Sequence, residues 1–209
     1  MKTRYISTLV FSLLLSACAT APFDYPREEE YAIAADTPTA LKDSVDGWLA
    51  KHPGPSGFYP LIDGMSALGA RIRLIERAEK SIDAQYFLMK ADTAGHVFAG
   101  ALLRAADRGV KVRFLLDDIF TTVEDVGLEV LNAHPNIEVR LFNPVSRRGI
   151  GFLNFIGDFR RANRRMHNKS FTVDHVVSVV GGRNIADEYF ELKTDAVFID
   201  FDMLSMGPI

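Results

Sequence analysis

The sequence predicts an α/β domain with a mixed sheet flanked by helices. From residue 63 to residue 142, helical and strand patterns alternate along the chain, which is the order that builds a parallel part of a sheet. A hairpin pattern between residues 166 and 184 adds antiparallel strands. The chain has 209 residues, of which 48% are hydrophobic, so it can form one globular domain with a core of its own.

Apolar spacing defines each element of the alternating part. Leu68 and Ile72 lie four residues apart, as on one face of a helix, whereas Ile82 and Ala84 alternate with other residues, as in a strand. Gly109 marks the end of a later helix. The predicted helices are 41–49, 65–80, 95–108 and 123–133, and the predicted strands are 81–88, 110–116 and 137–142.

Side chains that can bind ligands stand near two predicted strand ends, where sites of α/β proteins commonly open. They are Gln85, Tyr86, Asp117 and Asp118. Adjacent carboxylates can ligate a metal, but two acids alone do not set a coordination geometry. We therefore favour the interpretation that the two aspartates cap their strand end.

The most informative pattern is H-x-K-x-x-x-x-D, formed by His167, Lys169 and Asp174. Alternate residues of a strand share a face, so His167 and Lys169 are expected to point the same way. Aspartate suits turns through local hydrogen bonds of its side chain, and we place a turn between Asp174 and His175. The run 176–180 is then the buried return strand.

A second pattern, G-G-x-N at residues 181–184, follows the return strand. Antiparallel pairing about the predicted turn sets Gly182 opposite His167 and Asn184 beside the same spot. Gly181 and Gly182 have no side chains, so a bulky group can approach the backbone there.

An imidazole, an ammonium and a carboxamide would thus gather around one space, a combination that suits a phosphate group. Lys169 and Asn184 can hold phosphoryl oxygens by hydrogen bonds that strengthen as charge develops. His167 can attack phosphorus or protonate a leaving oxygen near neutral pH.

These residues resemble the H-K-D motif of the phospholipase D superfamily. Residues 166–169 (M-H-N-K) and 181–190 (G-G-R-N-I-A-D-E-Y-F) are most similar to bacterial cardiolipin synthases of the C type, although many superfamily members carry Ser where Gly182 stands. The resemblance implies a phospholipase D-like sandwich that is one half of a two-domain, bilobal enzyme. It implies the site residues His167, Lys169, Asp174 and Asn184, with Asp174 supporting the turn, and neither metal nor other cofactor.

The resemblance also implies an acid that orients the motif histidine from a later strand. The sequence predicts a helix at 185–194 and a strand at 196–206 that carries two candidates, Asp200 first and Asp202 second. A carboxylate on the far imidazole nitrogen would fix the tautomer. Solvated acids on an edge strand are the alternative, since exposed acids are common.

The chain carries one such motif, whereas phospholipase D chemistry uses two that face each other. The other histidines, at 52, 96, 134 and 175, lack a Lys two places on. We expect this chain to be the N-terminal half of a longer two-motif protein, with a homodimer as the alternative.

The N-terminal sequence indicates a targeting segment. Residues 1–17 have a basic start, an apolar core and a small-residue exit, and Leu15 to Cys18 match the lipobox of bacterial lipoproteins. We expect lipidation at Cys18, a tether at 18–40 and the phospholipase D-like domain at 41–209. The localisation predicted is a bacterial membrane facing the periplasm, the outer membrane being favoured because Ala19 follows Cys18. An ordinary secretory signal or an uncleaved anchor remains the alternative.

The segment 147–165 mixes aromatic residues with arginines. It fits an element resting on an anionic bilayer and, equally, a surface helix packed on the domain. A net charge of −3 argues against a nucleic-acid partner. The function predicted is phosphatidyl transfer between phospholipids through a phosphohistidine. The alternatives are a phospholipase D hydrolase, a nuclease acting as a homodimer, and an inactive half-domain.

Overall fold

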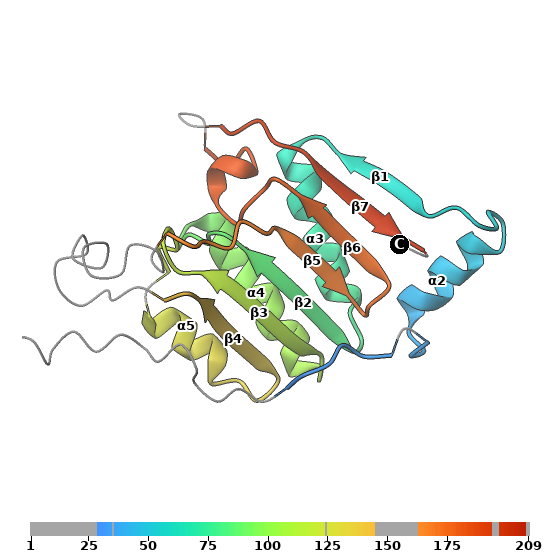
Figure 1. The fold of residues 1–209 in the computed structure, drawn as a ribbon, viewed down its shortest axis with the longest axis horizontal. Helices are drawn as coiled ribbons and strands as arrows, with labels where there is room; N and C mark the ends of the chain where they lie inside the picture. Colours follow the sequence, from blue (N-terminus) through green and yellow to red (C-terminus); the bar gives the residue numbers. More distant parts are fainter. Residues whose placement is uncertain (1–28, 35, 124, 145–162, 194–196, 208–209) are drawn as a thin grey trace, which may run out of the picture.

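The computed structural model describes residues 29–34, 36–123, 125–144, 163–193 and 197–207 (Figure 1). The helices are α2 (Ala40–Leu49), α3 (Gly64–Arg77), α4 (Thr93–Asp107), α5 (Asp125–Asn132) and the short 3₁₀ turn η1 (Asp187–Tyr189). The strands are β1 (Gly57–Leu61), β2 (Ser81–Tyr86), β3 (Lys111–Asp117), β4 (Ile137–Phe142), β5 (Ser170–Val173), β6 (Val177–Gly181) and β7 (Asp202–Met206).

The strands form one mixed sheet in the order β1-β7-β6-β5-β2-β3-β4. β2, β3 and β4 are parallel neighbours, and the remaining pairs are antiparallel. The predicted alternation of helices and strands is therefore confirmed. So is the antiparallel hairpin that joins the parallel part, with β5 pairing with β2.

The helices begin where the sequence offers a capping side chain. The carboxylate of Asp63 accepts a hydrogen bond from the backbone N–H of Ser66 at 2.7 Å, which caps α3. Asp92 caps α4 in the same way, through the N–H of Gly95 at 3.0 Å. The predicted helix 65–80 therefore begins one residue earlier than expected and ends at Arg77.

The apolar core lies between the sheet and the layer of helices α3, α4 and α5 (Figure 1). The fully buried ring of Phe98 on α4 stands edge-on to Tyr86, Phe114 and Phe171, which come from β2, β3 and β5. These contacts fix α4 across the strands whose ends form the site.

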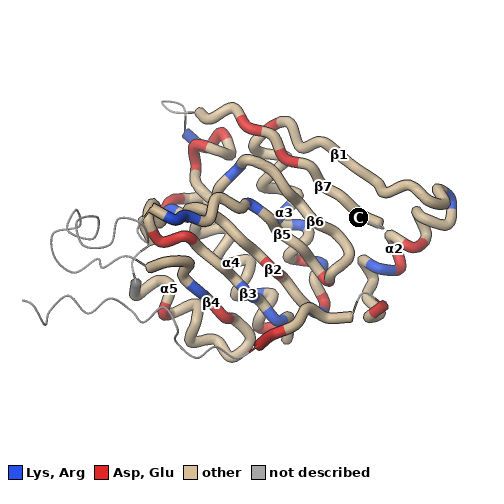
Figure 2. The backbone as a smooth tube through the Cα atoms, in the orientation of Figure 1, with Lys and Arg blue, Asp and Glu red and all other residues tan. Residues whose placement is uncertain are grey.

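No helix in the described part of the chain covers the opposite face of these central strands (Figure 1). Several of its side chains are polar and pair across neighbouring strands, whereas Leu115 of β3 is an apolar residue on this face. Asp83 bonds to Arg113 at 2.5 Å, and Thr172 bonds to Ser178 at 2.8 Å. Figure 2 shows acidic and basic residues interleaved along the chain.

The predicted hairpin register is wrong by one position. Val173 pairs with Val177, so the turn has three residues, and Asp174 and His175 take left-handed φ angles of 51° and 56°. The N–H of Gly181 consequently bonds to the carbonyl of Lys169 at 3.3 Å. β5 begins only at Ser170, so His167 lies before the strand.

Two predicted elements after the hairpin are also wrong. In place of a helix at 185–194 the described residues 185–193 form only η1. The backbone of Ile185 bonds instead to the extension of β2, its N–H to the carbonyl of Leu88 and its carbonyl to the N–H of Lys90. The predicted strand 196–206 is reduced to β7, and residues 197–201 are not part of it. β1 was not predicted, since Pro60 and exposed aromatic residues break its alternation.

The predicted signal peptide and Cys18 lie outside the described residues, as does most of the segment 147–165. The described part of the expected tether contacts the domain. Glu30 pairs with Lys111 at 2.5 Å, and the carbonyl of Ile33 bonds to Nδ1 of His175 at 2.8 Å. Within the described ranges, no helix has the length and apolar character needed to cross a membrane.

Candidate active site

His167 and Lys169 lie at the end of the sheet where β2 and β3 end and β5 begins. Ser170, the first residue of β5, pairs with Gln85 near the end of β2. The side chain of Asn168 donates to Oε1 of Gln85 at 2.9 Å, which extends this pairing toward the motif. The site therefore sits at the carboxyl ends of the parallel strands, where α/β folds bind ligands.

Phe87, just beyond β2, is the common neighbour of the two principal motif residues. The His167 ring meets the Phe87 ring edge-on with centroids 4.6 Å apart, and Nζ of Lys169 lies 5.2 Å from the Phe87 centroid. The ring of Phe120, which is itself exposed, also meets Phe87 edge-on, with centroids 5.4 Å apart. No sequence motif indicates Phe87; its place near the end of a predicted strand is the available signal.

His167 and Lys169 differ in exposure. His167 is exposed, and its imidazole makes no hydrogen bond within the described part of the chain. Lys169 is only 7% exposed, and its ammonium donates to the carbonyl of His167 at 3.0 Å. Burial lowers the pKa of Lys169 from its ordinary value, an effect that the negative charge of Asp200 opposes. A poorly solvated ammonium beside an accessible imidazole can attract and hold an anion.

Asn184 is buried and held from two sides. Its Oδ1 accepts from the N–H of Leu88 at 3.2 Å, and its Nδ2 donates to the hydroxyl of Tyr189 at 2.9 Å. An amide group has two N–H donors, and one bond to Tyr189 uses one of them. The end of β2 thus contacts all three expected phosphate-binding side chains, Phe87 meeting His167 and Lys169 and Leu88 meeting Asn184.

The space beside the two glycines is filled by the chain that leads into β7. A Cβ on Gly181 would lie 2.1 Å from Oδ1 of Asp202, and one on Gly182 would lie 1.7 Å from Oδ1 of Asp200. The N–H of Gly182 also bonds to the carbonyl of Phe201 at 3.0 Å. The close approach that the glycines permit is therefore made by the protein itself.

The two candidate orienting acids have different surroundings. Asp202 is fully buried, pairs with Arg71 at 2.9 Å and accepts the N–H of Arg183 at 3.2 Å. Asp200 is half-buried and lies over Gly182, near enough to Lys169 to influence its pKa. Within the described ranges neither carboxylate makes a hydrogen bond to His167.

Asp174 lies at the end of β5 away from His167. Its fully buried carboxylate accepts from the backbone N–H groups of Glu79, Lys80 and Ser81 at 3.1, 2.8 and 2.9 Å. These bonds fasten the β5–β6 turn to the connection between α3 and β2, which is the contact a support for the turn would make.

Asp117 acts as a cap, as favoured from the sequence. Its buried carboxylate accepts from the N–H of Ile119 at 3.0 Å, from the N–H of Met166 at 2.7 Å and from Nη1 of Arg165 at 3.0 Å. In the part of the chain that the structure describes, no group of three His, Cys, Asp or Glu side chains is arranged to hold a metal ion.

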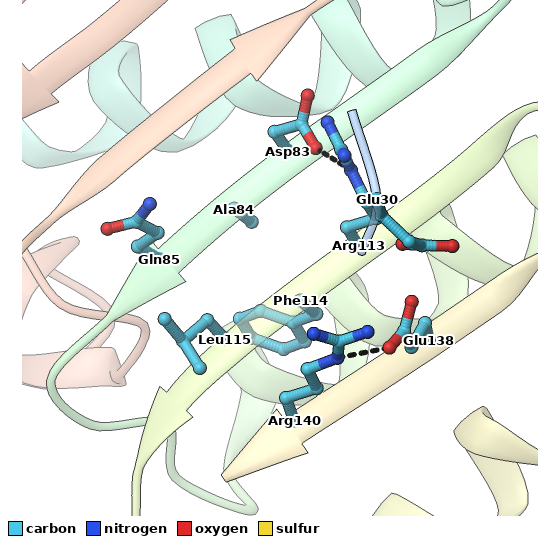
Figure 3. Close-up of a pocket in the computed structure, with 9 residues that line it drawn as sticks. All are labelled: Glu30, Asp83, Ala84, Gln85, Arg113, Phe114, Leu115, Glu138 and Arg140. Atoms are coloured by element: carbon cyan, nitrogen blue, oxygen red, sulfur yellow. Dashed lines mark hydrogen bonds and ion pairs between the residues drawn. The ribbon is translucent and has the colours of Figure 1, made fainter. Parts of the chain in front are cut away.

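A groove lies on the uncovered face of the sheet. It is lined by Glu30, Asp83, Ala84, Gln85, Arg113, Phe114, Leu115, Glu138 and Arg140 (Figure 3). Its guanidinium groups are already paired, Arg113 with Asp83 and Arg140 with Glu138. The edge around His167 is therefore the better place for a reaction.

The sequence matches a family model described as "Cardiolipin synthase, PLD-like domain" over residues 71–205. It is 51% identical over 169 residues to cardiolipin synthase C of Escherichia coli strain K12, a match covering 81% of this chain and 36% of that protein. It is 32% identical over 127 residues to a cardiolipin synthase of Clostridium perfringens strain 13, covering 61% of this chain and 25% of that protein. The matches thus span well under half the length of these relatives.

Solved structures share the fold at low identity. Phosphatidylserine synthase from Haemophilus influenzae Rd KW20 matches 72% of this chain and 33% of its own, with a TM-score of 0.55 and 18% identity. NucT from Helicobacter pylori matches 73% of this chain and 85% of its own, with a TM-score of 0.52 and 18% identity. The chain belongs to the cardiolipin synthase family of phospholipase D-like domains.

Proposed function

We propose that this domain forms one half of a phosphatidyl-transfer site that acts on phospholipids in the manner of phospholipase D. The observation that carries the proposal is the exposed imidazole of His167 beside the buried ammonium of Lys169, at the open edge of the sheet. Similarity to proteins named cardiolipin synthase supports phospholipids as the substrates.

In the proposed reaction, an imidazole nitrogen of one motif histidine attacks the phosphorus of a phosphodiester. A nitrogen–phosphorus bond forms, the bond to the leaving alkoxide breaks, and the histidine of the second motif gives that alkoxide a proton. An acceptor hydroxyl then loses its proton to the second histidine, and its oxygen displaces the first histidine from phosphorus. His167 can fill either role, because an imidazole acts as nucleophile or as acid and base near neutral pH.

Lys169 and Asn184 are proposed to hold the phosphoryl oxygens. Burial disfavours the charged form of Lys169, and a bound phosphate anion would stabilise that charge. Asp200 is the proposed orienting acid. Asp202 is the weaker candidate, because its carboxylate already binds Arg71 and Arg183.

The second motif is proposed to lie in the same full-length protein. The matches cover 36% of the E. coli relative, so that relative has ample chain for a second half. A homodimer that brings two copies of His167 together is the alternative. We further propose that lipidation at Cys18 holds the domain on a bacterial membrane, facing the periplasm.

The test is lipid turnover by the full-length protein on vesicles of phosphatidylglycerol, whose headgroup offers acceptor hydroxyls. We expect His167→Ala to abolish the product lipid and to leave thermal stability unchanged, because the side chain is exposed. His96→Ala is the matched control, since His96 is an exposed histidine on the surface of α4.

The alternatives give different products. Phosphatidic acid alone would indicate a hydrolase, and cleavage of DNA without lipid turnover would indicate a nuclease. An active His167→Ala protein would contradict the assignment of His167.

A further inference from the structure

A buried carboxylate outside the motif holds the chain that leads into His167. Asp117, the last residue of β3, is fully buried. Its Oδ2 accepts from the N–H of Met166 at 2.7 Å, and its Oδ1 accepts from Nη1 of Arg165 at 3.0 Å. Both donors belong to the two residues immediately before His167, so these bonds fix the backbone that leads into the motif histidine.

A second set of bonds fixes the same segment to the end of β4. Nη2 of Arg165 donates to the carbonyl of Asn143 at 2.6 Å, and Nδ2 of Asn143 donates to the carbonyl of Arg164 at 2.7 Å. On the other side of His167, the side chain of Asn168 donates to Gln85 on β2. The backbone is thus fastened on both sides of a histidine whose ring makes no hydrogen bond in the described part of the chain.

We infer that Asp117 is a positioning residue: it sets where the backbone of His167 lies, and Arg165 is its charged partner. The inference rests on the proposed function, in which the His167 imidazole must meet phosphorus in line. A misplacement of about 1 Å can cost about 100-fold in rate. Charge-assisted bonds to a buried carboxylate are suited to prevent such a shift, because they are short and directional.

Asp117→Asn tests the inference. The amide keeps the size of the side chain but replaces one carboxylate oxygen with an NH2 donor and removes the negative charge, so either the Met166 N–H or the Arg165 guanidinium faces another donor. We expect kcat for lipid transfer by the full-length protein to fall at least about tenfold, with KM changed less than twofold. Asp83→Asn is the control, because Asp83 also pairs with an arginine but makes no bond to residues 163–169.

Hydrogen exchange of the Met166 amide gives a readout that does not depend on activity. We expect exchange to accelerate in Asp117→Asn and to stay unchanged in Asp83→Asn. Should Asp117→Asn fail to fold, Arg165→Met removes the charged partner, and Arg165→Lys, which keeps the charge, should recover part of the rate. The double variant Asp117→Asn/Arg165→Met should lose less kcat than the product of the two single-variant losses, because both substitutions remove the same ion pair.

The results separate this inference from the proposed function. A folded Asp117→Asn protein with wild-type kcat and wild-type Met166 exchange would overturn the inference while leaving His167 in its role. Loss of thermal stability with no change in kcat of the folded protein would show a merely structural residue and would also overturn it. If the wild type itself has no lipid turnover, the proposed function fails, and the exchange measurement still decides whether Asp117 fixes this segment.

Discussion

The structural role of the motif aspartate, Asp174, can be distinguished by experiment from the chemical role proposed for His167. Asp174 lies seven residues from His167, and the four-residue strand β5 between them spans about 13 Å at about 3.3 Å per residue. Its carboxylate accepts three backbone N–H groups from residues 79–81. We therefore expect substitutions of Asp174 to lower the free energy of unfolding and to spare the chemistry at His167.

The magnitude follows from the bonds lost. A hydrogen bond to a charged group contributes about 1.5 kcal/mol, so Asp174→Ala should cost about 4.5 kcal/mol for three such bonds. The alanine would also occupy a left-handed φ of 51°, at about 1 kcal/mol more. Asp174→Asn should cost about 2 kcal/mol, because asparagine tolerates this conformation and keeps one acceptor oxygen.

Urea denaturation of both variants supplies the measurement, with lipid transfer normalised to the folded fraction. Thr172→Ala is a control on the same strand, since it removes a single hydroxyl bond to Ser178. Two results would refute the reasoning: an Asp174→Ala protein within about 1 kcal/mol of wild type, or a fully folded Asp174→Asn protein without activity.

Two further predictions concern the buried groups around the site. Because burial lowers the pKa of Lys169, the unfolded chain binds this proton more tightly, and the group's contribution to stability should rise with pH between the lowered pKa and about 10.4. Lys169→Met should remove this alkaline rise, raise Tm at pH 7 and abolish phosphate binding; an unchanged pH profile of Tm would contradict this. Gly181→Ala should destabilise by about 1–3 kcal/mol, and more than Gly182→Ala. The new methyl group meets backbone atoms of Phe201 and Asp202 in the first case and the movable carboxylate of Asp200 in the second. Equal Tm values for these two variants would count against that account.

The alternation of elements could be predicted because local spacing encodes it. The apolar positions of α3 and β2 follow helical and strand periods, and capping aspartates stand at the starts of α3 and α4. The hairpin register was not predictable from the same rules. The extra residue is Val176, whose N–H bonds to the carbonyl of Val173 at 3.0 Å, so that Val177 becomes the partner of Val173. Local spacing does not distinguish this three-residue turn from a two-residue one.

The candidate site was predicted where its residues are close in sequence and missed where they are not. His167 and Lys169 were found by spacing, but Asp202 pairs with Arg71, 131 residues away, and no local pattern indicates that contact. The predicted helix after Asn184 failed for the same reason, since the backbone of Ile185 is bonded to residues that follow β2. Long-range bonds decided these cases against local propensity.

Two buried ion pairs near the site have the same arrangement, in which the carboxylate binds both an arginine and a backbone N–H. Asp117 pairs with Arg165 beside His167, and Asp202 pairs with Arg71 while holding the N–H of Arg183 beside Asn184. Replacing a buried ion pair by apolar side chains is often neutral or stabilising, so stability alone is a weak reason for either pair. In each pair the carboxylate also binds a backbone N–H adjacent to an expected site residue. We therefore infer that these bonds serve to fix the backbone at Met166 and Arg183. Apolar replacements of either ion pair should keep the fold but accelerate hydrogen exchange of these two amides.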